Sequence, residues 1–175
     1  MRRLFHRALA APDDVVARAG LGQGVKVLAS AAERSGSWLL GTRDHLVVVP
    51  ADGQATALPW QRVESAEWER ETERLRVSEV GEYGQQRPMH EYVIDDPGQL
   101  ITFVRERVTA SVVLQRRVVV RDRLGLLVVA RRAPNGNGEL TWSYELDAGL
   151  DPADPEVQEM AERGVRAAAE ALGLT

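Results

Sequence analysis

The period of the hydrophobic pattern changes near the middle of this chain, and that change limits the folds available to it. Between residues 25 and 94 apolar and polar residues alternate in short runs, as where Leu75 and Val77 stand between arginine and serine. Alternation with a period of two indicates strands with one buried face. From Pro97 a 3.6-residue period takes over, with apolar residues at Leu100, Ile101, Val104, Val108 and Val112. A one-sided helix that follows several strands covers a sheet, so the sequence predicts an α+β fold.

Turn signals divide the strand region into short antiparallel segments. Gly-Thr-Arg-Asp at 41–44 and Asp-Gly at 52–53 are typical of tight connections, and Glu-Thr-Glu at 71–73 separates two alternating runs. Pro59 cannot donate to a ladder and indicates a strand end or an edge. The predicted strands are 25–31, 38–40, 46–49, 55–58, 65–70, 74–80 and 91–96.

The remaining segments lie on both sides of this region. A short helix is predicted within 11–22, a hairpin within 117–132, a strand at 140–146 and a last helix that begins at Asp154 and Pro155. We therefore expect an N-terminal helical arm over 1–23, a main domain over 24–115, and C-terminal strands and a helix over 116–175 that pack on the same core. The predicted core contains Trp60, Val63, Trp68, Leu75, Val77, Leu100, Val104 and Val108.

Composition narrows the classes of protein. The chain of 175 residues contains no cysteine, which excludes disulfides, thiol nucleophiles and thiolate metal sites. No apolar run approaches a membrane span, and the apolar start is interrupted at His6 and Arg7, so we expect a cytoplasmic protein that is not secreted. A net charge of −4 does not indicate a nucleic-acid partner.

Motifs for catalysis or metal binding are weak. The three histidines lie far apart, and the glycines at 20–24 precede a strand, whereas a dinucleotide loop follows one. No nucleophile elbow or P-loop occurs. The acidic residues between Asp147 and Glu156 do not match the spacing of a calcium loop, and helix capping accounts for part of them. The sequence predicts no catalytic residue, no metal and no cofactor.

Arginines between residues 116 and 132 form the one candidate binding constellation. Arginine presents a planar fork that binds phosphate or carboxylate bidentately, so this cluster could bind an anionic surface. Acidic residues are in excess in 64–97 and in 134–175, and basic residues in 98–133. The alternative is therefore that the arginines pair with these acidic blocks, within the fold or across a homodimer interface. The candidate residues are Arg116, Arg117, Arg121, Arg123, Arg131 and Arg132.

Three segments resemble bacterial pleckstrin-homology-like (PH-like) domains: "SWLLGTRDHLVVV", "ALPWQRVESAEWERETERLRV" and the helix "QLITFVRERV". The likeness covers roughly 24–115. It implies a PH-like antiparallel barrel or sheet capped by an amphipathic helix, with a C-terminal extension of strands and a helix. It also implies a scaffold that binds peptides, proteins or lipid headgroups rather than an active site. The segment "RERVTASVVLQRRV" is similar to actinobacterial proteins, and this similarity implies no function.

Two functions from different classes follow. The leading hypothesis is a non-enzymatic PH-like module that acts through protein contacts, with an unidentified protein partner. The alternative is a carrier or enzyme that encloses a small ligand in a pocket between the sheet and the last helix. A filled barrel would favour the module, and a buried pocket lined by polar side chains with strongly shifted pKa values would favour the alternative.

Overall fold

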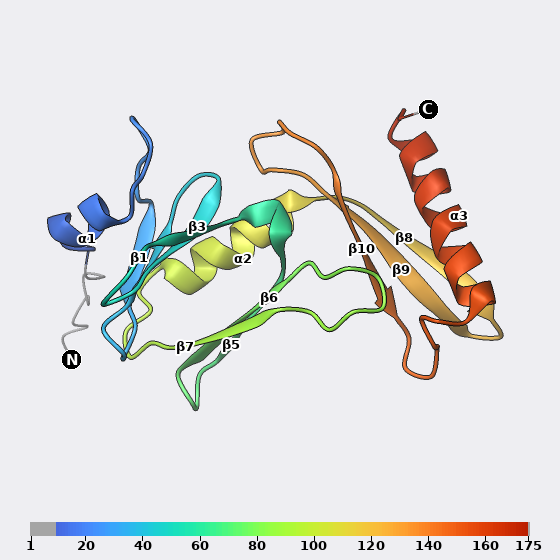
Figure 1. Ribbon diagram of the computed structural model, residues 1–175, viewed down its shortest axis with the longest axis horizontal. Coiled ribbons are helices and arrows are strands. Elements are labelled where there is room, and N and C mark those ends of the chain that lie inside the picture. Colours follow the sequence, from blue (N-terminus) through green and yellow to red (C-terminus); the bar gives the residue numbers. More distant parts are fainter. Residues whose placement is uncertain (1–9, 175) are drawn as a thin grey trace, which may run out of the picture.

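A computed structural model describes residues 10–174, which contain three α-helices and ten strands in three antiparallel sheets (Figure 1). The α+β prediction is confirmed. The start of the expected N-terminal arm, with His6 and Arg7, lies outside the described residues. Within 10–174, no helix combines the length and apolar character that crossing a membrane requires.

The first sheet has the order β1-β2-β3-β4, which is the order of the chain, so hairpins connect neighbouring strands. The predicted connection at 41–44 is present: the Thr42 hydroxyl donates to the His45 carbonyl at 3.0 Å, and the His45 N–H donates to Thr42 Oγ1 at 3.0 Å. The strands are β1 (Ala29–Ala32), β2 (Trp38–Gly41), β3 (His45–Val49) and β4 (Thr56–Pro59).

Strand β1 is shorter than predicted. The alternation suggested a strand from Val25, but the ladder with β2 begins at the pair Ala29 and Gly41. The Leu28 N–H still donates to the Gly41 carbonyl at 2.8 Å, whereas the Val25 N–H turns back to the Gly22 carbonyl at 3.1 Å. β2 has no residues left to pair with the segment before Ala29, so Val25 remains exposed.

The second sheet has the order β5-β6-β7 and is separated from the first by a corner. Pro59 ends β4, and the 3-10 turn η1 (Trp60–Arg62) redirects the chain into β5 (Val63–Glu69). Because β4 and β5 are not paired, the sheets described in 10–174 do not close into a barrel. β6 (Arg74–Glu79) follows the predicted turn, where Glu73 has a positive φ of 55°, and β7 (Met89–Val93) completes the sheet.

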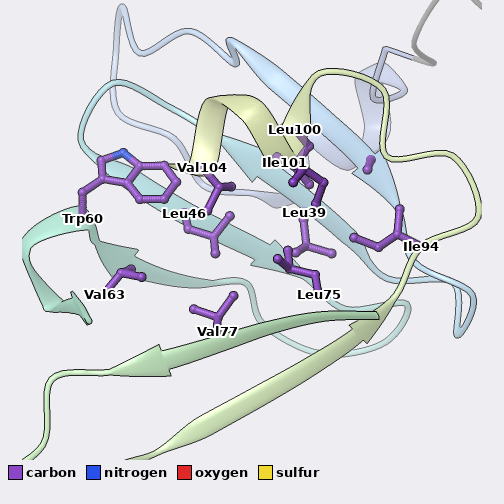
Figure 2. Packing of buried hydrophobic residues seen from close by; sticks show 11 residues of the cluster. Leu39, Leu46, Trp60, Val63, Leu75, Val77, Ile94, Leu100, Ile101 and Val104 are labelled. Atoms are coloured by element: carbon purple, nitrogen blue, oxygen red, sulfur yellow. The ribbon is translucent and has the colours of Figure 1, made fainter. Parts of the chain in front are cut away.

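Helix α2 (Leu100–Ser111) packs on both sheets and buries the main core (Figure 2). Leu100 and Val104 from the helix lie against residues of the first sheet, the corner and the second sheet. Gly41 permits the close approach, since a Cβ there would lie 2.6 Å from the Phe103 ring. The core prediction is confirmed: Trp60, Val63, Leu75, Val77, Leu100 and Val104 are buried together, and Trp68 and Val108 pack at its margin.

The opposite face of the first sheet is covered by helix α1 (Asp13–Arg18). Val15 and Ala19 are buried there against Leu40, Val47 and Val49. The two faces of this sheet are therefore both covered, which explains why β2 and β3 are almost continuously apolar.

The third sheet and the last helix form a C-terminal unit. The sheet has the order β10-β9-β8, with β8 (Val112–Arg121), β9 (Leu124–Arg131) and β10 (Thr141–Leu146). Val112 was expected in the helical stripe, but it begins β8 directly after α2.

Helix α3 (Pro155–Ala171) packs on β8 and β9 of this sheet. Gly164 allows this contact, because a Cβ there would lie 2.8 Å from a Val118 methyl group. The sequence suggested a core shared with residues 24–115, but these elements bury a cluster of their own around Leu126, Val128 and Val157. Tyr83, from the loop between β6 and β7, packs at the margin of this cluster.

Candidate functional site

The six candidate arginines all lie on the third sheet or directly beside it. Arg116, Arg117 and Arg121 are on β8, Arg123 is in the β8–β9 turn, and Arg131 ends β9 with Arg132 after it. Because successive residues of a strand point to opposite faces, Arg116 and Arg117 do not share a face. Their surroundings decide which of the six can contact a partner.

Arg117 is held by an acidic residue of the last segment. Its Nη1 donates to Asp147 Oδ1 at 2.9 Å, and its Nη2 contacts Asp147 Oδ2. Asp147 also accepts the Gly125 N–H at 2.9 Å. The hydrogen bonds from Arg117 and then Gly125 lower the pKa of Asp147, so this carboxylate stays charged and bound to the fold.

Arg121 has two acidic partners at the start of α3. Its Nη2 lies 2.5 Å from Asp154 Oδ2 and 2.7 Å from Glu156 Oε2. Asp154 is also the N-cap of α3, since it accepts the Glu156 N–H at 2.9 Å. The hydrogen bond from Arg121 is the main cause that lowers the pKa of Asp154. The predicted pairing of the basic block with the C-terminal acidic block is present at both Arg117 and Arg121.

Arg131 is buried and connects the C-terminal unit with the main core. It donates to the Glu64 carbonyl at 2.8 Å and to Ser111 Oγ at 3.1 Å, and it reaches the Val108 carbonyl at 3.4 Å. Burial lowers its pKa, while Glu64 and Glu145 raise it. Arg131 therefore positions β9 against α2 and β5 and cannot contact an external anion.

The remaining arginines, Arg116, Arg123 and Arg132, differ in how far they are exposed to contact with a binding partner. Arg116 and Arg123 are exposed, and no acidic side chain within 10–174 forms an ion pair with either. Arg132 is half-buried, and its Nε is enclosed without a hydrogen-bond partner. The six arginines thus do not form one outward patch. Arg117 and Arg121 are paired on the surface, Arg131 is buried and Arg132 is half-buried. Among the described residues, Arg116 and Arg123 remain as free surface charges.

The free edge of β8 lies beside these two charges. β8 is ten residues long and pairs only with β9, so every second backbone amide and carbonyl points away from the sheet. Across residues 10–174, the backbone hydrogen bonds of 112–121 are those of the ladder with β9 and the bond from the Val112 N–H to the Thr109 carbonyl at the end of α2. Val113 and Val119 are 42% and 55% exposed on this strand. β8 therefore presents an unpaired edge with two exposed valines and free positive charge beside it.

Reversing the charge of Arg121 is expected to destabilise the fold. Arg121→Glu would place a third carboxylate beside Asp154 and Glu156 and remove their shared partner. We expect the melting temperature to fall by roughly 2–4 °C at neutral pH. The difference should shrink in acid, because the folded-state pKa of Asp154 is lowered and the stabilisation is lost as pH falls through that pKa.

Arg123→Glu is the control, and differential scanning calorimetry of Arg121→Glu and Arg123→Glu measures both melting temperatures. Arg123→Glu makes the same charge change at an exposed residue without an acidic partner, and we expect it to leave the melting temperature unchanged. Equal effects of the two substitutions would contradict the structural role of Arg121.

Sequence reasoning missed Glu64, the buried carboxylate beside Arg131. A register irregularity between Val63 and Ser65 breaks the two-residue alternation, so Val63 and Glu64 are both buried. No turn residue or proline marks this irregularity in the sequence. Within the part of the chain that the structure describes, no three His, Asp or Glu side chains come together as a metal site would require.

Comparison with protein-family models, with curated proteins and with solved structures gives no match to this chain.

Proposed function

We propose that this protein is a non-enzymatic interaction module of the PH-like type, and that it binds an extended acidic segment of a partner protein along the free edge of β8. The order of elements supports the PH-like part, because a four-stranded sheet, a three-stranded sheet and a helix follow one another over residues 29–111. The core between them is filled by side chains, which favours function at the surface.

The observation that carries the binding mode is the unpaired edge of β8. A long edge strand offers backbone donors and acceptors to another chain, and peptide recognition by strand addition uses this property. Ten residues are enough to pair with an extended peptide over several ladder positions. The exposed Val113 and Val119 would add apolar contacts with alternate side chains of that peptide.

The free positive charges beside β8 determine which kind of peptide segment this edge can bind. Arg116 and Arg123 are exposed and lack acidic partners among residues 10–174, so they attract negative charge. A second copy of β8 would bring arginine against arginine, which disfavours a homodimer through this edge. An extended segment with alternating glutamate and valine has both the charge and the period that β8 requires.

Binding of a synthetic peptide tests the proposal. A labelled ten-residue peptide of alternating valine and glutamate should bind the full chain in fluorescence anisotropy, and one of alternating valine and lysine should not. Affinity should fall at least about tenfold between 0.1 M and 1 M salt, because the Debye length contracts from about 10 Å to about 3 Å. Hydrogen exchange should slow at residues 112–121.

Two matched charge reversals locate the site. Arg116→Glu should weaken peptide binding about tenfold, whereas Arg105→Glu, an exposed position on α2, should change it less than about twofold. Equal effects, absence of binding at low salt, or protection from exchange outside 112–121 would overturn the proposal. Binding to anionic vesicles without binding to the acidic peptide would also overturn it, in favour of a lipid surface.

A further inference from the structure

A cavity of about 600 Å³ lies between the second sheet with its β6–β7 loop and the C-terminal unit. One wall is the β6–β7 loop, which extends toward β10 (Figure 1), and the other is β10 with the loop that follows it. The volume is in the range of sites that bind small organic molecules. A smaller cavity of about 240 Å³ against α3 shares Tyr83 and Tyr144 with it. The larger cavity is therefore not between the sheet and the last helix, where the sequence placed the alternative pocket.

Arg87 holds the β6–β7 loop against β10. Its Nη2 donates to the Tyr144 carbonyl at 2.7 Å, across 57 residues of chain. Its Nε lies 2.9 Å from Glu64 Oε2 on β5. The cavity is thus formed by a fixed loop with a defined anchor at each side.

Glu64 is the feature of this cavity that calls for a ligand. Its side chain is 4% exposed, and neither carboxylate oxygen has a hydrogen-bond partner. The contact with Arg87 brings opposite charges together without the direction of a hydrogen bond. Burial raises the pKa of Glu64, and Glu145 adds to the rise, while Arg87 and Arg131 oppose it. A buried carboxylate whose one close cation is poorly aligned for a hydrogen bond is costly. Both oxygens are enclosed, so a ligand N–H group would satisfy them after the Glu64 side chain turns toward the cavity.

Two further polar groups at the cavity lack hydrogen-bond partners, and its wall combines apolar side chains with polar ones such as Gln85 and Gln86. Ser143 Oγ and the Tyr83 hydroxyl are buried without a hydrogen bond. The rings of Tyr83 and Tyr144 meet edge to face with centroids 5.1 Å apart. Such rings contact both an apolar body and a cation favourably. Further apolar wall residues are Met89, Leu146, Leu150 and Pro152.

The charge of the lining favours a cation over an anion. Glu64, Glu82 and Asp147 are its acidic residues, and Arg87 is its single basic residue. Arg117 neutralises Asp147, but Glu82 remains exposed at the rim. Arg87 itself already donates to Tyr144 and faces Glu64, which neutralises part of its charge toward a ligand anion.

We propose that this cavity binds a small organic amine whose ammonium group donates hydrogen bonds to Glu64 and whose apolar body lies against Tyr83 and Tyr144. This inference does not rest on strand addition at β8, because the cavity and the β8 edge have no residue in common. It extends the function from a protein-binding module to one that also carries a small-molecule site.

Titration of the full chain with phenethylamine tests the site. Two-dimensional NMR should show saturable shifts of backbone amides within 81–87 and 143–152. 2-Phenylethanol, which has a similar shape without the charge, should bind at least about tenfold more weakly, and phenylacetate should not bind. Absence of saturable shifts up to about 10 mM amine, or equal affinity for the alcohol, would overturn the proposal.

Two isosteric substitutions identify the anchor. Glu64→Gln removes the buried charge and should weaken phenethylamine binding at least about tenfold, while Glu82→Gln at the rim should change it less than about threefold. Equal losses in the two variants would overturn the role of Glu64. If Glu64→Gln does not fold, Leu150→Trp, which narrows the cavity from the opposite loop, should abolish the amide shifts. Unchanged binding in that variant would also overturn the proposal.

Discussion

Val104→Asp is expected to lower the free energy of unfolding by about 3 kcal/mol or more. Val104 is fully buried on the inner face of α2, within the cluster that joins both sheets of the main core. The residues of this cluster that surround Val104 are apolar, so the new carboxylate would be removed from water among them. Urea unfolding followed by circular dichroism measures the change.

Arg105→Asp is the matched control for this substitution. Arg105 is the next residue of the same helix and is exposed, so aspartate enters the helix there without burial of a charge. The loss of helix propensity is larger at Arg105 than at Val104, because valine and aspartate have similar propensities. We expect this variant to lose less than about 1 kcal/mol. A similarly small loss for Val104→Asp would show that α2 does not pack on the sheets as described.

Trp60→Ala is expected to cost about 3–5 kcal/mol. The Trp60 side chain is fully buried at the corner between the two sheets of the main core. Its ring meets Phe103 edge to face at a centroid distance of 6.0 Å, and its Nε1 donates to the Thr42 carbonyl at 3.1 Å. Alanine would leave a cavity and an unpaired carbonyl, which thermal unfolding would register as a large fall in melting temperature.

Trp60→Phe separates the two contributions. Phenylalanine retains most of the buried ring but cannot donate to Thr42, so we expect a loss of about 1–2 kcal/mol, well below that of alanine. A Trp60→Ala variant as stable as the parent chain would mean that the corner is not part of the core.

The local features of the main domain could be predicted because each depends on neighbouring residues. The connection at Thr42 and the turn at Glu73 follow from short-range turn chemistry. The burial of Val104 follows from the 3.6-residue spacing of the apolar residues, which places them all on one face of the helix. These signals do not depend on which distant segments pack together.

The candidate site could be predicted only in part, because its details depend on contacts between distant residues. Arg131 follows an apolar run that gives no period, and its burial depends on Glu64, 67 residues earlier. The irregularity after Val63 moves Glu64 to a buried position, which alternation assigns to the exposed face. Arg121 is paired because the start of α3 packs beside β8, a placement that composition alone does not indicate.

The direct passage from α2 into β8 has a mechanical consequence. Ser111 ends the helix and Val112 begins the strand, so no linker residue separates them. Arg131 donates to the Ser111 hydroxyl, and the Arg132 N–H donates to the Ser111 carbonyl at 2.8 Å. Swivelling of the C-terminal unit would break both bonds and expose buried charge. The part of the chain up to Ser111 and the C-terminal unit from Val112 are therefore held in one relative orientation. A peptide bound to β8 would lie at a fixed angle to the first sheet.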